Sequence, residues 1–212
     1  MKLTIPSLLA ALLAALSFTA CEDNVSEDLE DKLSGFVTCM TDGRGHITEM
    51  KDDFGQRFKV YDSRYILDKN SSYRRICTYT IGKDSTAVIH DMAVPNCHEA
   101  ADISATSLDY LESDPFDIES AYTGGGYLNI VLKIMTHDET SFRRHYLEAV
   151  RISSPDSLVF SIVHNDNGDI PVYTKKLYFC IPLSNYGLGK NSAVFFKYRN
   201  YREEDCCLKF AY

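Results

Sequence analysis

Short apolar runs separated by turn residues occupy most of the chain after residue 32. The clearest is residues 127–135, where Leu or Ile recurs at every second position from 128 to 134. A period of two puts alternate side chains on opposite faces of a strand, so this run predicts a half-buried β-strand. Similar runs predict further strands at residues 35–40, 57–61, 73–81, 85–92, 144–152, 158–164, 176–183, 193–198 and 207–210.

The predicted strands fall into two blocks. Residues 33–95 hold several short strands and a hairpin connection at 82–84, which favours a compact OB-like barrel. Residues 113–212 hold regularly spaced strands, which favour a β-sandwich. Pro95 breaks the first pattern, and residues 96–112 are expected to form a linker with room for one short helix. The sequence therefore predicts an all-β protein, an N-terminal OB-like barrel followed by a C-terminal β-sandwich.

The N-terminus carries the strongest local signal. Lys2 precedes an apolar run over residues 5–20, which is too short to span a bilayer of about 30 Å comfortably and suits a secretory signal. The run ends in Phe18-Thr19-Ala20-Cys21 and resembles a bacterial lipobox, although Phe18 stands where Leu is preferred. This resemblance implies cleavage after residue 20 and a diacylglyceryl group on the Cys21 thiol. The alternative is cleavage elsewhere, with Cys21 an ordinary thiol.

Residues 21–32 are expected to be an acidic tether. Six acidic residues and one base follow Cys21 here, and the segment has too little apolar surface to fold. Acidic residues directly after the lipid cysteine resemble the export signal of Bacteroides-type bacteria, which implies the outer face of the outer membrane. A solvated linker on a periplasm-facing anchor would look the same. In both cases the membrane is a predicted partner, through the lipid on Cys21.

Composition narrows the class of protein. The 212 residues include 45% hydrophobic and 25% charged residues, so the chain is neither disordered nor fibrous. The net charge is −8 and Lys and Arg form no longer run than a pair, whereas nucleic-acid binding requires clustered basic residues. We therefore expect no nucleic-acid partner.

Two stretches resemble a known family. Residues 118–130, which include Tyr122 and the three glycines 124–126, and residues 158–169 are similar to the NigD-like lipoproteins of Bacteroidetes, with Tyr122 where Trp is expected. This resemblance implies a lipobox, an N-terminal OB-type barrel and a C-terminal β-sandwich. The family is named after a bacteriocin gene cluster and supplies no catalytic residues to carry over.

Several residue groups suggest chemistry that their spacing does not support. The glycines at 124–126 lack the Lys and Ser or Thr of a phosphate loop, so they predict a bend that allows close backbone approach. Residues 165–169 supply Asn and Asp oxygens but lack the downstream Glu of a calcium loop, so a β-turn is preferred over a metal site. Six histidines without zinc-binding spacing are expected at loops and strand ends: His46, His90, His98, His137, His145 and His164.

The cysteines and two of the tyrosines each allow more than one structural role. Export permits disulfides, and we expect at most one or two, joining Cys39 to Cys77 and Cys180 to Cys206 or Cys207; buried free thiols are the alternative. Tyr122 and Tyr127 flank the glycines and are candidate ligand contacts, although packing at the core or its rim would also explain them.

These observations favour a non-catalytic binding or interaction module, lipid-anchored at the outer membrane and facing the cell exterior. Its expected partner is an unidentified protein or glycan, and no cofactor, metal or catalytic residue is predicted. A bacteriocin-immunity or envelope-protection factor is one alternative, and an enzyme acting on glycans or peptides is another.

Overall fold

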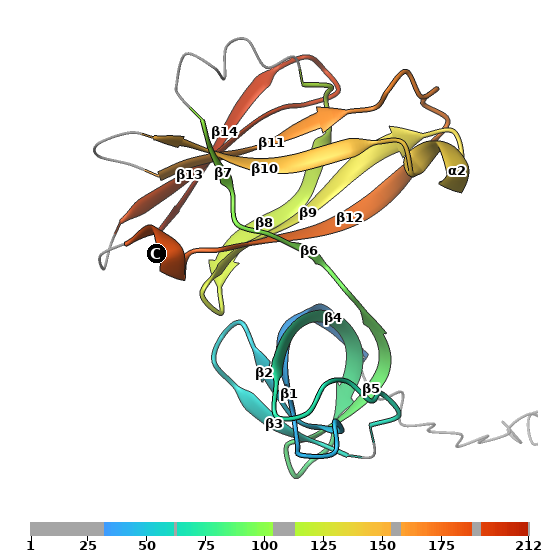
Figure 1. Ribbon diagram of the computed structural model, residues 1–212, viewed down its shortest axis with the longest axis vertical. Coiled ribbons are helices and arrows are strands. Elements are labelled where there is room, and N and C mark those ends of the chain that lie inside the picture. Colours follow the sequence, from blue (N-terminus) through green and yellow to red (C-terminus); the bar gives the residue numbers. More distant parts are fainter. Residues whose placement is uncertain (1–31, 62, 104–112, 154–157, 188–191, 212) are drawn as a thin grey trace, which may run out of the picture. The chain divides into compact units, whose positions relative to one another are not determined.

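The computed structural model describes residues 32–61, 63–103, 113–153, 158–187 and 192–211 (Figure 1). The predicted signal peptide, the lipidation site Cys21 and all but the last residue of the predicted tether lie outside the described residues. No helix in the described part of the chain is long and apolar enough to cross a membrane.

Five strands near the N-terminus close into a barrel. Its order is β1-β2-β3-β5-β4, with β3 and β5 parallel and the other pairs antiparallel. The inward side chains, among them Val37, Met50 and Phe58, form a separate buried core. The strands are β1 (Leu33–Thr41), β2 (Ile47–Asp52), β3 (Arg57–Val60), β4 (Ser72–Ile81) and β5 (Thr86–Ala93).

The remaining strands form two sheets. One sheet has five strands in the order β14-β13-β11-β10-β7, and the other has four in the order β6-β12-β9-β8 (Figure 1). The first comprises β7 (Ala101–Ile103), β10 (Tyr146–Ser153), β11 (Leu158–Asn165), β13 (Ala193–Arg199) and β14 (Asp205–Ala211). The second comprises β6 (Asn96–Cys97), β8 (Asp117–Gly124), β9 (Tyr127–Thr136) and β12 (Tyr173–Pro182).

A single apolar core holds these two sheets together. The Leu and Ile side chains at 128, 130, 132 and 134 of β9 are completely buried in it, as the alternating pattern predicts. Phe160 of β11 and Phe196 of β13 contribute from the opposite sheet. Full burial of one Leu, Ile or Phe side chain contributes about 1.5–3 kcal/mol. The predicted all-β class, with an OB-like barrel before a β-sandwich, is confirmed.

The linker expected at residues 96–112 is wrong for its first part. Asn96–Cys97 pairs with β12 and Ala101–Ile103 pairs with β10, both in parallel, so this segment supplies an edge strand to each sheet. Strands of two and three residues are too short to show a period, which is why the sequence pattern missed them. No helix lies within 96–103, and residues 104–112 lie outside the described residues.

The disulfide pairings expected from the sequence also need correction. Cys180 is bonded to Cys97, which joins β12 to β6, rather than to Cys206 or Cys207. The latter two lie on β14, in the other sheet, and are free. Cys39 and Cys77 do lie side by side in the barrel core, with sulfurs 3.9 Å apart, but as buried free thiols.

Candidate ligand pocket

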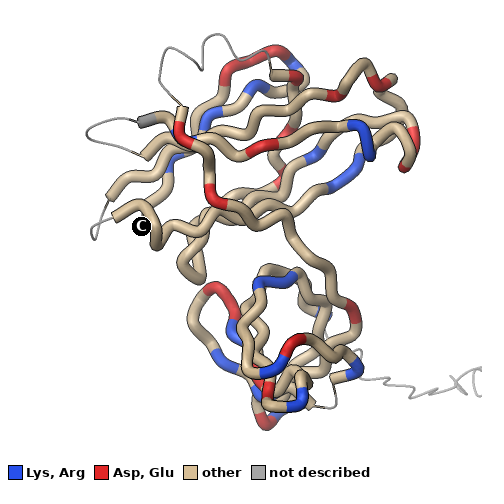
Figure 2. Tube along the Cα trace, viewed as in Figure 1, with Lys and Arg blue, Asp and Glu red and all other residues tan. Residues whose placement is uncertain are grey.

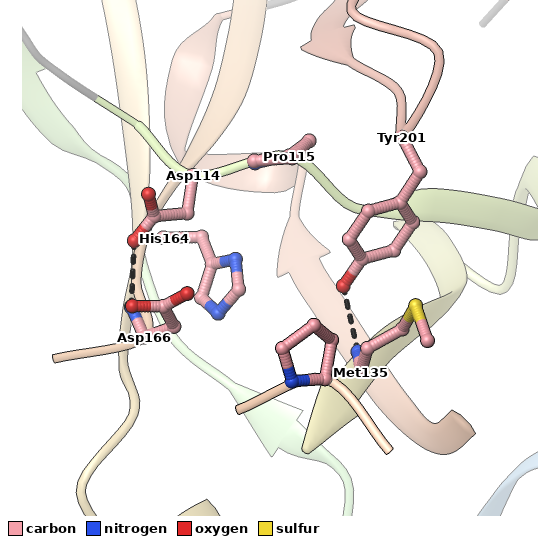
Figure 3. A pocket seen from close by; sticks show the side chains of 7 residues that line it. Asp114, Pro115, Met135, His164, Asp166 and Tyr201 are labelled. Atoms are coloured by element: carbon pink, nitrogen blue, oxygen red, sulfur yellow. Dashed lines mark hydrogen bonds between the residues drawn. The ribbon is translucent and has the colours of Figure 1, made fainter. Parts of the chain in front are cut away.

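A cavity of about 240 Å³ opens at one end of the sandwich (Figure 3). Its walls come from the segment before β8, the end of β9, the end of β11 with the turn that follows, the segment before β12, and the turn between β13 and β14. The lining residues are Asp114, Pro115, Met135, His164, Asp166, Pro171 and Tyr201.

Backbone hydrogen bonds fix the two carboxylates of the pocket. The Asp166 N–H donates to Oδ2 of Asp114 at 2.7 Å, and the Gly168 N–H donates to Oδ1 of Asp166 at 2.7 Å. Residues 165–169 form the turn that the sequence predicts, with Gly168 at φ 74°. Each carboxylate therefore has one oxygen held by the backbone and a second oxygen with no hydrogen bond from the described residues.

Two buried histidines and an aspartate form a chain of hydrogen bonds that ends at the pocket. Nε2 of His145 lies 3.0 Å from Oδ2 of Asp169, and Nδ1 of His145 lies 3.0 Å from Nε2 of His164. The side chains of His145 and Asp169 are 0% and 2% exposed, and His164 is 2% exposed. Thr136 also donates to Asp169 Oδ2, at 2.5 Å.

The protonation of His145 determines which ring nitrogen of His164 carries the proton. A carboxylate only accepts hydrogen bonds, so Nε2 of His145 carries the proton that it shares with Asp169. If His145 is neutral, its Nδ1 accepts the proton on Nε2 of His164; if His145 is protonated, its Nδ1–H donates to Nε2 of His164, and the proton of a neutral His164 is on Nδ1. This Nδ1 is buried and has no hydrogen-bond partner in the described part of the chain.

The surroundings favour the neutral form of His164. Burial lowers the pKa of His164, and the charge of the neighbouring His145 lowers it further, although the charge of Asp114 and the backbone oxygens of Pro115 and Asp114 act in the opposite direction. Burial alone would raise the pKa of Asp169, but hydrogen bonds from Thr136, His145 and two backbone N–H groups outweigh it and hold that pKa well below its usual range. The result is a charged Asp169 behind a neutral imidazole.

The remaining walls of the pocket are mostly apolar. Pro115, Pro171 and Met135 line it, together with Tyr201, whose hydroxyl oxygen accepts the Met135 N–H at 2.6 Å (Figure 3). Burial raises the pKa of Tyr201, so its hydroxyl is neutral at pH 7. The pocket thus combines apolar walls with a few polar groups, as small-molecule sites do.

The candidate ligand contacts Tyr122 and Tyr127 lie elsewhere, against the barrel. The hydroxyl of Tyr122 donates to Oδ2 of Asp53 at 2.7 Å, and the ring of Tyr127 lies 4.7 Å from the guanidinium carbon of Arg74. Oδ1 of Asn129 accepts from Arg74 at 2.8 Å. Both tyrosines therefore serve intramolecular contacts in this structure, and neither lines the pocket.

The three glycines make this contact close. The Gly125 N–H donates to the Asp53 carbonyl at 3.1 Å, and Gly125 has φ 62°. A Cβ at this position would lie 2.4 Å from Oδ1 of Asp53, so a residue with a side chain would force the Asp53 carboxylate to move. The bend expected at 124–126 is therefore the β8–β9 turn, and it contains glycine because the Asp53 loop lies against it.

Sequence reasoning missed the buried chain of His145, His164 and Asp169. One signal was present: positions 158, 160 and 162 of β11 share a face, and His164 continues the same period of two toward the core. The link to His145 and Asp169 depends on long-range contacts and has no local signature. No group of three or more His, Cys, Asp or Glu side chains within the described residues is arranged to hold a metal ion.

Fold and pocket together define an all-β protein in which a small barrel precedes a sandwich, and the sandwich carries the pocket. The chain belongs to the NigD-like family, because residues 99–212 match the NigD-like C-terminal β-sandwich domain. The resemblance noted from the sequence is thereby confirmed. No curated protein matches the chain.

Solved structures share this fold at low sequence identity. A NigD-like immunity protein from Bacteroides caccae ATCC 43185 superposes with a TM-score of 0.66 at 22% identity, over 84% of this chain and 96% of its own. A protein from Parabacteroides distasonis ATCC 8503, named as toxin-related, gives 0.65 at 17% identity, over 85% and 94%. A protein from Bacteroides fragilis NCTC 9343, named as a lipoprotein, gives 0.57 at 9% identity, over 86% and 98%.

Proposed function

We propose that this chain is a lipid-anchored binding protein of the bacterial outer membrane that captures a small ligand in the sandwich pocket without transforming it. The observation that carries the proposal is a pocket in the sandwich whose mostly apolar walls also hold His164 and two carboxylates, those of Asp114 and Asp166.

Binding fits these groups better than turnover. The lining residues include no Ser, Thr or Cys that could act as a nucleophile beside His164. One oxygen of each carboxylate is held by a backbone N–H, which suits fixed recognition of a ligand. Lys and Arg are interspersed with Asp and Glu along both domains (Figure 2), which supports excluding nucleic acid as the partner.

The proposed location rests on the lipobox ending at Cys21 and on the acidic residues after it. A structural relative is itself named as a lipoprotein. Detergent phase partition of the chain expressed in a Bacteroides-type host tests the anchor: wild type is expected in the detergent phase and Cys21→Ser in the aqueous phase. Protease treatment of intact cells tests the exposed face. Equal partition of the two forms would contradict lipidation.

Binding without turnover is tested by incubating the full chain with a small-molecule extract of the cell envelope, followed by mass spectrometry of the retained compounds. A matched protein, the Asp114→Asn, Asp166→Asn double variant, keeps the oxygens that the backbone bonds require. We expect compounds retained by wild type alone and recovered with unchanged mass. New masses that accumulate only with wild type would instead indicate an enzyme.

Immunity to a bacteriocin is the second candidate, favoured by the name of the Bacteroides caccae relative. A strain lacking the gene, challenged with bacteriocins of neighbouring strains, should then become sensitive, and wild type but not Cys21→Ser should restore protection. Unchanged sensitivity across the panel would leave the binding role as the remaining proposal.

A further inference from the structure

The last strand of the sandwich, β14, leaves one edge of its sheet open. It lies at the end of the five-stranded sheet and, within the described residues, pairs only with β13 (Figure 1). Leu208 and Phe210 pack against the sandwich core, yet both stay only half-buried, as expected for side chains beside an open edge. An unpaired strand edge offers its backbone groups to a further strand.

Two hydrogen bonds show which backbone groups of β14 face outward. The carbonyl of Glu204, just before β14, accepts the N–H of Asn200, just after β13, and so points toward β13. The carbonyl of Ala211, at the other end, accepts the hydroxyl of Thr123 on β8 and points away from β13. Backbone groups alternate in direction along a strand, and the register with β13 has no shift. The free, outward-facing N–H and C=O groups are therefore those of residues 205, 207 and 209.

The other edges of the two sheets are protected against pairing. β7 has three residues and β6 has two, and β8 carries a bulge between Ile118 and Ser120. Short strands and bulges are common means of blocking an edge. β14 has seven residues in regular register, so within the described sandwich it is the edge best suited to a further strand.

The exposed side chains of β14 complement a second copy of the same strand. Asp205 and Lys209 lie two positions before and two positions after Cys207, and all three are exposed. Neither charged residue has an ion-pair partner among the described residues. In an antiparallel pair of two β14 strands centred on Cys207, Asp205 of each copy lies directly opposite Lys209 of the other copy, and such opposite-charge pairs are stabilising.

We propose that two copies of this chain associate edge to edge through β14, antiparallel and centred on Cys207, so that their five-stranded sheets become one continuous sheet. The interface is two-fold symmetric, with the same strand contributed by each copy. Residues 205, 207 and 209 of the two copies form three directly opposed pairs, each exchanging two N–H···O=C bonds. This inference goes beyond the proposed function and does not depend on the pocket or its ligand.

Other arrangements of the edge match less well. Centring the pair on Asp205 or on Lys209 places like charges directly opposite each other, which is destabilising. Centring it on Cys206 or on Leu208 places one of the three outward-facing residues opposite a position outside 205–209. A strand of an unrelated protein would form the same kind of backbone bonds, but the symmetric placement of the two charges is matched by the strand itself.

Sedimentation equilibrium of the full chain in a density-matched detergent measures the association. Three residue pairs make a small interface, so we expect a reversible monomer–dimer equilibrium with a Kd of about 10–100 µM. Thermal melts of wild type and of each variant verify that the fold is unchanged.

Charge reversal tests the register. Asp205→Lys and Lys209→Asp each place like charges opposite each other twice in the dimer, so each is expected to weaken dimerisation about tenfold or more. The double variant restores opposite charges in the same register and is expected to return the Kd to within about threefold of wild type. Lys59→Asp, the matched control, reverses an exposed charge on β3 of the barrel and should dimerise as wild type does.

A thiol cross-link locates the centre of the interface. Opposed residues of a hydrogen-bonded pair have Cα atoms about 5.5 Å apart, which a disulfide can span. Diamide, which takes up the two thiol hydrogens, should therefore join Cys207 of one copy to Cys207 of the second copy, as peptide mapping would show. In the control, Cys207→Ser with Val88→Cys, the exposed thiol lies on the barrel instead, and no cross-linked dimer is expected.

Four results would overturn the inference: a monomer at protein concentrations up to about 1 mM, single charge variants that dimerise as tightly as wild type, a double variant as weak as the single ones, or equal cross-linking of the Val88→Cys control. An edge that instead pairs with a strand of another protein would give the first result. Retention of compounds from the envelope extract is measured separately, so failure of dimerisation is distinguishable from failure of the proposed function.

Discussion

Arg74 and Asp53 form an ion pair almost completely removed from water, with side chains 4% and 3% exposed and Nη2 2.6 Å from Oδ1. Asn129 accepts a second hydrogen bond from the same guanidinium, and Tyr122 donates to the carboxylate. Charges taken out of water must be compensated in this way, because a buried ion that loses its partner is strongly destabilising.

Arg74→Ala is expected to lower the free energy of unfolding by about 3–5 kcal/mol, because Asp53 would keep a buried charge without its cation. Urea unfolding followed by circular dichroism measures the change. The control is Arg57→Ala, which breaks the ion pair between Arg57 and Glu49. The side chains of these two residues are 62% and 35% exposed. An exposed pair contributes about 0–1 kcal/mol, so similar losses in the two variants would contradict the role assigned to the Arg74 pair.

Gly125→Ala should destabilise the protein more than Gly187→Ala. The two glycines have nearly the same φ, 62° and 61°, so the conformational cost of a side chain is similar, about 1–2 kcal/mol. At Gly125 the new Cβ meets Oδ1 of Asp53 at 2.4 Å, whereas at Gly187 no atom of the described residues lies within 4 Å. Differential scanning calorimetry of both variants compares them, and the larger loss must fall on Gly125.

Asp169→Asn should reduce stability at neutral pH and make less difference in acid. The folded-state pKa of Asp169 is held below its ordinary value of about 3.9 despite burial, because Thr136, His145 and the backbone hydrogen-bond to the charged form. The stabilisation by the wild-type carboxylate is therefore complete above that ordinary pKa and is lost progressively as the pH falls below it. Urea midpoints of both proteins from pH 7 to pH 3 provide the test; a constant gap would be inconsistent with this linkage.

His164 should titrate below the ordinary histidine pKa of about 6.5, because burial and then His145 lower its pKa. Between these two pKa values His164 is protonated in the unfolded chain and neutral in the folded chain. The free energy of unfolding therefore falls as the pH decreases from about 6.5 toward the folded-state pKa. An NMR titration of the imidazole Cε1–H signal measures the midpoint, and the signal missing in His164→Gln assigns it. A midpoint above the ordinary value would contradict the neutral imidazole.

Loss of the Cys97–Cys180 disulfide should cost about 2–4 kcal/mol, since it links positions 83 residues apart in sequence. Cys97→Ser tests this by thermal unfolding, and Cys207→Ser, which removes an exposed free thiol, is the control and should change little. Peptide mapping without reductant should recover the 97–180 cross-link. A cross-link to Cys206 or Cys207 would contradict the pairing described here.

Strand pattern was sufficient for most of the fold and failed where the strands are irregular. The period of two located β9 because its alternate side chains face a single core. It missed β2, in which Ile47 and Met50 are both buried although they lie three positions apart. The register shift opposite Met40 and Thr41 skips Thr48, which brings both side chains to the barrel interior. Such a bulge leaves no mark in a periodic pattern.

The pocket was less predictable than the fold. His164 sits in the right phase of β11 to face inward, yet that phase cannot distinguish a core histidine from a binding one. Its partner His145 and the carboxylate of Asp169 lie 19 and 5 residues away in sequence and meet it through the sheet and the following turn. Residues 165–169 were correctly predicted as a turn, but nothing in the sequence showed that Asp169 would be buried.

The short edge strand β6 determines where a fragment must begin if the sandwich is to fold on its own. The family match starts at residue 99, whereas β6 covers Asn96–Cys97. A fragment cut at residue 99 would expose the backbone edge of β12 and leave the Cys180 thiol without its partner, two features that promote aggregation and mispairing. A fragment intended to fold alone should therefore start no later than residue 96, directly after the Val94-Pro95 connection.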